Sequence, residues 1–100
     1  MVDPDTLSVW LRNRLSDDFV SEAWIFGSVL DTDRQPNDID IFVKYPNKNS
    51  MRIPGWRRQI QGEFSERFGL PLHILALTHS ECVESASFLE SSLRGAKRVR

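Results

Sequence analysis

Two apolar segments that flank a polar loop restrict how this chain can fold. Residues 24–26 are apolar, and so is every residue from 39 to 43 except Asp40. Short runs of this kind, rich in Ile, Phe and Val, predict buried β-strands. Asp38 stands immediately before the second run, and Asp40 lies inside it. The chain must therefore place two carboxylates at or within a hydrophobic sheet.

Asp38 and Asp40 are expected to point to the same side of the second strand. Side chains alternate along a strand, so residues two apart share a face, with Cα atoms roughly 6–7 Å apart. Two negative charges about 4 Å apart repel by about 4 kcal/mol at an effective dielectric constant near 20. A cation, a proton or a basic side chain must offset this repulsion. The pair is thus a candidate functional site; the alternative is a turn-flanking pair capped by nearby backbone N–H groups.

The remaining pattern predicts helices around a small sheet. Asp3-Pro4 is a typical helix start, and the capping box from Thr78 to Glu81 begins the last helix, which ends at Gly95. The three expected helices bury stripes at helical spacing, namely Leu7/Trp10/Leu11/Leu15, Trp56/Ile60/Phe64/Phe68 and Cys82/Ala86/Leu89/Leu93. Gly69 suits the end of the second of them.

Strands are expected at residues 20–26, 39–45 and 72–77, and residues 97–100 are either a short edge strand or frayed. The order helix, strand, strand, helix, strand, helix indicates an α/β (α+β) fold, with a three-stranded mixed sheet and flanking helices. One hundred residues suit a single domain spanning residues 1–100.

Composition excludes several classes of protein. No run of 18 apolar residues is present, so no membrane span is expected, and Met1–Asp5 lacks the features of a signal peptide. A single cysteine, Cys82, allows no internal disulfide and fits a reducing cytoplasm. The net charge of −1 argues against nucleic acid as a partner. Nucleic acid is a weaker alternative partner, which would bind through the basic residues Arg52, Arg57 and Arg58 and the basic tail.

One combination of motifs carries a family resemblance. Phe26-Gly27-Ser28 ends the first apolar strand, residues 29–37 intervene, and Asp38-Ile39-Asp40 opens the second. This spacing resembles the signature of the nucleotidyltransferase superfamily related to DNA polymerase beta, and above all its minimal nucleotidyltransferases (MNT). Residues 87–95 also look like that family's closing helix.

The resemblance implies a nucleotidyltransferase fold and assigns roles to individual residues. Gly27 and Ser28 would bind the nucleotide phosphates. Asp38 and Asp40 would be catalytic and would bind Mg²⁺, with Mn²⁺ as an alternative. Members of the family commonly have a third carboxylate on a later strand. Here residues 72–77 contain no Asp or Glu, and His73 occupies the expected position, as a site residue or as a structural edge histidine.

The function implied is Mg²⁺-dependent transfer of AMP, or another nucleoside monophosphate, from ATP or a related triphosphate to a protein or small-molecule hydroxyl. Minimal nucleotidyltransferases often accompany a helical HEPN-type protein as antitoxin and toxin, so a HEPN-type partner is expected. Because His73 replaces a carboxylate, an alternative is a catalytically impaired module that binds nucleotide or a partner protein.

Overall fold

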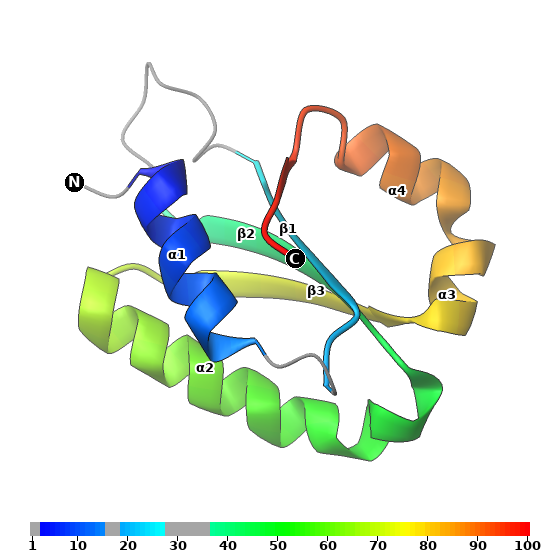
Figure 1. The fold of residues 1–100 in the computed structure, drawn as a ribbon, viewed down its shortest axis with the longest axis horizontal. Coiled ribbons are helices and arrows are strands. Elements are labelled where there is room, and N and C mark those ends of the chain that lie inside the picture. Colours follow the sequence, from blue (N-terminus) through cyan, green and yellow to red (C-terminus); the bar gives the residue numbers. More distant parts are fainter. Residues whose placement is uncertain (1–2, 16–18, 28–36) are drawn as a thin grey trace.

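The protein has an α+β fold, and its computed structural model describes residues 3–15, 19–27 and 37–100. Helices cover a four-stranded mixed sheet (Figure 1). The elements in chain order are α1 (Pro4–Arg14), β1 (Glu22–Phe26), β2 (Ile39–Tyr45), the 3₁₀ helix η2 (Asn47–Arg52), α2 (Ile53–Phe68), β3 (Leu72–Thr78), α3 (His79–Glu84), α4 (Ala86–Ser92) and β4 (Lys97–Arg98). The predicted strands and the first two predicted helices are present, with boundaries shifted by one or two residues.

The sheet is mixed, as expected, but it has four strands in the order β3-β2-β1-β4 rather than three, because the tail forms the short edge strand that was one of its two alternatives. β1 runs antiparallel to both β2 and β4, whereas β2 and β3 are parallel. The added strand is the C-terminal tail, in which the Val99 N–H donates to the Ala23 carbonyl over 2.8 Å. The tail becomes an edge strand because β1 has a free edge. The two residues of β4 are too few to show a strand pattern of their own.

The core lies between α1, α2 and one face of the sheet. β1 alternates strictly, with Ala23 and Ile25 buried and their neighbours only partly buried. The first two predicted stripes supply the helical half of this core, and Leu7, Leu11 and Phe64 are fully buried. In Figure 1, α1 and α2 lie together on the same side of the sheet.

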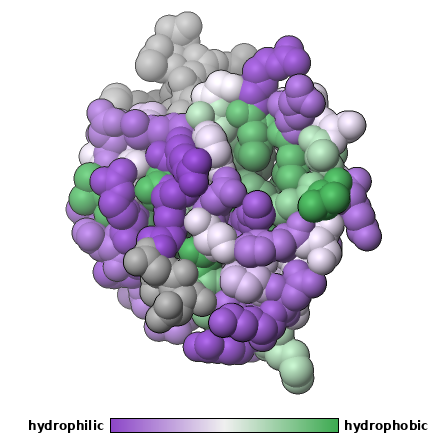
Figure 2. Space-filling model, turned by 45° about the vertical axis from the view of Figure 1, so that its right-hand side comes forward, coloured by the Kyte–Doolittle hydropathy of each residue, from purple (hydrophilic) through white to green (hydrophobic). Residues whose placement is uncertain are grey.

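The C-terminal helical segment differs from the prediction. The capping box is present, since Thr78 and Glu81 exchange hydrogen bonds of 2.9 and 3.1 Å. The helix is interrupted at Ser85, however, and neither α3 nor α4 has a buried residue. Val83 and Phe88 are 78% and 58% exposed, and Figure 2, which turns the α3–α4 side forward, shows apolar side chains gathered on this surface. The predicted third stripe is therefore only partly covered.

None of the helices in the described part of the chain could cross a membrane. The longest is α2 with 16 residues, and only one side of it faces the core.

Candidate metal centre

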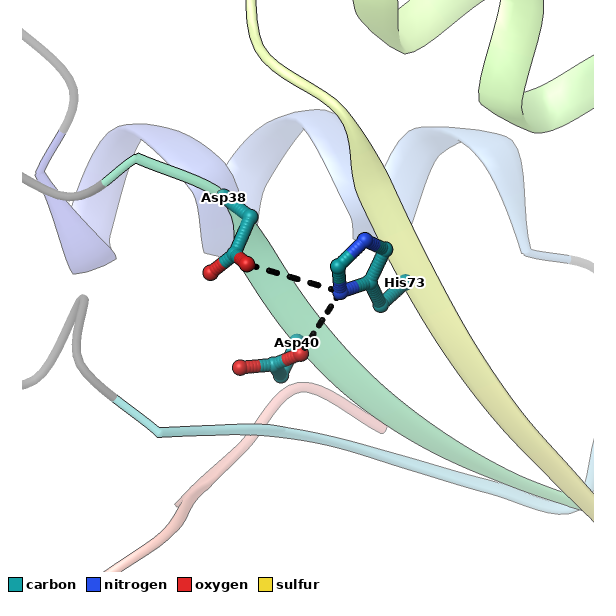
Figure 3. Close-up of side chains that lie close together, drawn as sticks. All are labelled: Asp38, Asp40 and His73. Atoms are coloured by element: carbon teal, nitrogen blue, oxygen red, sulfur yellow. Dashed lines mark ion pairs between the residues drawn. The ribbon is translucent and has the colours of Figure 1, made fainter.

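Strand register brings the two aspartates and the histidine together. Asp40 on β2 pairs with His73 on the parallel neighbour β3 and with Phe26 on the antiparallel neighbour β1. Asp38 precedes β2 by one residue and lies on the same side as Asp40. Figure 3 shows the carboxylates of both aspartates directed toward the His73 ring. The position at which the resemblance implies a third carboxylate, occupied here by His73, thus lies directly beside Asp40.

The three side chains are close enough to share one ion. The Nδ1 atom of His73 lies 3.3 Å from Asp40 Oδ1 and 3.6 Å from Asp38 Oδ2. One ligand atom from each residue falls within 4.8 Å of the others. Two ligands at right angles around Mg²⁺, each at 2.0–2.1 Å, are about 3 Å apart. The distance from the ring nitrogen to Asp40 exceeds that spacing by about 0.3 Å and the distance to Asp38 by about 0.6 Å, so small side-chain movements would bring the atoms to it.

The site is open to solvent but not fully hydrated. The side chains of His73, Asp38 and Asp40 are 59%, 36% and 28% exposed, so a ligand can reach all three. Burial raises the pKa of Asp40, and the neighbouring charge of Asp38 raises it further, while His73 counters part of this increase. The folded protein therefore disfavours the second negative charge, and a bound cation would relieve this cost.

Backbone capping of the two aspartates was the alternative reading of the sequence. Within the described residues, hydrogen bonds from backbone N–H groups to side-chain oxygens lie elsewhere, at Asp3, Thr78 and Glu81. The partner that the described residues do give Asp38 and Asp40 is His73. The capping alternative and the ion-binding interpretation both stay predictions, because residues 28–36, which precede the pair, lie outside the described residues.

Gly27 adjoins the Asp40 carboxylate. Its φ of +84° lies in the left-handed region, and a Cβ built on it would be 2.6 Å from Asp40 Oδ2. Glycine has no Cβ, so the backbone can lie this close to the carboxylate. The nucleotide-binding role that the resemblance implies for Gly27 stays a prediction. Ser28 lies outside the described residues, so its role in phosphate binding stays a prediction.

Changing Gly27 to alanine is expected to weaken metal binding directly, in addition to destabilising the fold. The added methyl must displace the Asp40 carboxylate, and the positive φ costs about 1–2 kcal/mol for an L-residue. Gly95→Ala is the matched control, because Gly95 has φ +77° with open space around its Cβ position. Thermal unfolding with and without Mn²⁺ should show similar destabilisation in both variants but loss of metal-induced stabilisation only in Gly27→Ala. Equal metal responses would contradict this expectation.

Comparisons with protein-family models, with curated proteins and with solved structures found no match to this chain. The case for its function therefore rests on the residues and the geometry described above.

Proposed function

We propose that this protein is a divalent-metal-dependent nucleotidyltransferase with the fold of the DNA polymerase beta-like superfamily. The observation that carries the proposal is the convergence of Asp38, Asp40 and His73 beside Gly27, at one end of the central strands. The mixed sheet with helices against one face is compatible with such a fold. The order of the motifs in the sequence supports it independently of the geometry.

The reaction would join the α-phosphorus of a nucleoside triphosphate to an acceptor hydroxyl. The bond from the α-phosphorus to the bridging oxygen breaks, pyrophosphate leaves, and the hydroxyl releases its proton. A bound divalent ion would supply charge stabilisation for this transfer. Asp38 and Asp40 would hold that ion with anionic oxygens, and Gly27 keeps the space beside Asp40 free of a side chain.

Two labelled forms of ATP test this reaction directly. The protein is incubated with Mg²⁺ or Mn²⁺ and with the product of the neighbouring gene, using ATP labelled on either the α- or the γ-phosphate. Nucleotidyl transfer predicts that α-label enters a protein while γ-label leaves as pyrophosphate. Incorporation of γ-label would instead identify phosphoryl transfer, and the proposal would be wrong. Asp38→Asn serves as the inactive control.

The second candidate function is binding without turnover. The observation that favours it is His73, which lies beside Asp40 at the position where the resemblance implies a third carboxylate. This candidate predicts a stable complex with nucleotide or a partner protein and no transferred label. It also predicts that Asp38→Asn leaves the partner affinity unchanged.

The biological setting follows from the resemblance. A HEPN-type helical protein is the proposed partner, with this chain as the antitoxin and AMP transfer from ATP as its means of neutralising the partner. The cytoplasm is the proposed location, which suits the lone Cys82. Purification of the two gene products together, followed by the labelling assay, examines both parts of this setting.

A further inference from the structure

We infer that the site selects Mn²⁺ and the later first-row divalent ions over Mg²⁺, because His73 supplies a nitrogen ligand. The inference rests on the metal centre of the proposed function and specifies which ion that centre prefers. It concerns the ion alone and can be examined without a nucleotide or an acceptor.

The position of the ring makes His73 a ligand rather than a distant neighbour. Its Nδ1 atom is the ring nitrogen that lies near both carboxylates, at 3.3 and 3.6 Å. Pairing of β2 with β3 sets His73 directly beside Asp40, so the sheet holds the backbone of both ligands. The 59% exposure of His73 leaves its ring free to adjust around an ion. One nitrogen and two carboxylate oxygens therefore face the same space.

This set of donors suits transition metals better than Mg²⁺. Mg²⁺ favours oxygen ligands and gains most from anionic ones. Imidazole nitrogen suits Zn²⁺, Ni²⁺ and similar ions, and affinities at mixed nitrogen and oxygen sites rise from Mn²⁺ toward Cu²⁺. A neutral histidine in place of a third carboxylate removes one negative charge from the site, which lowers Mg²⁺ affinity. Ions that bind nitrogen lose less affinity through the same change, because the imidazole offsets part of the lost charge.

The chain offers a reversal variant and a matched control. His73→Asp restores a third carboxylate at the same register position, and His73→Gln removes the nitrogen ligand while keeping a polar side chain. His79 is the other histidine of the chain. It is exposed at the start of α3, where its Nε2 lies 2.8 Å from Ser21 Oγ. His79→Gln thus changes a histidine remote from the site.

The experiment is calorimetric titration of the metal-free full chain at pH 8 with Mn²⁺, Zn²⁺ and Mg²⁺ separately. We expect wild type and His79→Gln to bind Zn²⁺ about 10²-fold more tightly than Mg²⁺, with the affinity for Mn²⁺ between the two, because Mn²⁺ stands at the weak end of the first-row series and Zn²⁺ binds imidazole nitrogen well. His73→Asp should lower this ratio to about tenfold or less, chiefly by strengthening Mg²⁺ binding. Pulsed EPR of bound Mn²⁺ should show coupling to a nitrogen nucleus in wild type and none in either His73 variant.

Equal affinity of the wild type for Mn²⁺ and Mg²⁺, or a ratio that His73→Asp leaves unchanged, would overturn the inference. So would nitrogen coupling that persists in His73→Gln. These outcomes differ from failure of the proposed function. A protein that binds Mn²⁺ selectively but transfers no label would retain the inference and lose the enzyme assignment. If Mn²⁺ and Mg²⁺ bind equally tightly and support transfer equally, the enzyme assignment is retained and the inferred ion preference is lost.

Discussion

Replacing Asp40 with asparagine should reduce the proposed metal-dependent nucleotidyl transfer by roughly 10²–10³-fold. This range is typical of removing one group that stabilises charge in a transition state. The amide keeps the size of the side chain but removes an anionic ligand at the position paired with His73. The rate of α-label transfer at saturating Mn²⁺ measures the effect. A variant within threefold of wild type would show that Asp40 has no part in the reaction.

The same substitution should stabilise the metal-free protein. Burial and the charge of Asp38 raise the pKa of Asp40, so the folded state binds this proton more tightly than the unfolded chain does. Protonated Asp40 therefore stabilises the folded state at pH values below the pKa that this carboxyl has in the unfolded chain. The stabilisation is lost as the pH rises through the higher pKa that Asp40 has in the folded protein. At pH 8 the wild type therefore carries an ionised carboxylate that folding disfavours, and Asp40→Asn does not.

Thermal unfolding at pH 8, with and without Mn²⁺, measures both consequences. Without metal, Asp40→Asn should have the higher Tm. With metal in large excess, the wild type gains stability by mass action, about 2.7 kcal/mol at one hundred times Kd, and the order should reverse. Asp5→Asn is a suitable control, because the Asp5 carboxylate is 91% exposed on α1 and pairs with Lys97. An Asp40→Asn variant that gains as much from metal as the wild type would refute the assigned role.

Truncating Phe64 to alanine should destabilise the fold by about 3–5 kcal/mol, the cost of removing a buried aromatic ring from a core. Phe64 is 0% exposed. It packs edge-on against Trp10, with ring centroids 5.4 Å apart, and lies 4.7 Å from Phe68. It thereby joins α1 to α2 within the hydrophobic core. Domains of this size are stable by only about 5–15 kcal/mol, so the variant should lose a large share of its stability.

Urea unfolding measures this loss, and Phe88 provides the matched control. Phe88→Ala removes the same ring from a position that is 58% exposed on α4, so its effect should remain within about 0.5 kcal/mol. If the two variants lost similar free energies of unfolding, the α3–α4 segment would contribute to the core as much as α1 and α2 do. The structure gives the opposite expectation, because neither α3 nor α4 contains a buried residue.

Local patterns in the sequence predicted most of the elements. The stripe containing Ile60 and Phe64 repeats every four residues, and this spacing alone indicates one buried side of a helix. Asp3 before Pro4 indicated where α1 begins, and the Asp3 carboxylate accepts from the Thr6 N–H over 2.9 Å. Such signals depend on residues within one or two turns of each other, so they can be recognised without knowledge of the fold.

The coverage of the sheet could not be predicted in the same way. The stripe that includes Cys82 and Leu89 has the spacing of a buried helical face, yet these residues are only partly buried. The helix is interrupted at Ser85 and α4 has no buried residue, so that apolar face stays partly open. Helical spacing shows that a face is apolar, but whether another element covers it depends on the rest of the chain.

The sequence by itself determined that two carboxylates, Asp38 and Asp40, stand on one side of a buried strand next to a glycine turn. Only the tertiary structure decided that His73 lies directly beside Asp40, that Gly27 leaves no room for a side chain there, and that Lys97–Arg98 complete the sheet. The physical reason is that alternation along a strand is a property of neighbouring residues. Register between β2 and β3, and pairing of β4 with β1, depend on hydrogen bonds between residues far apart in the chain.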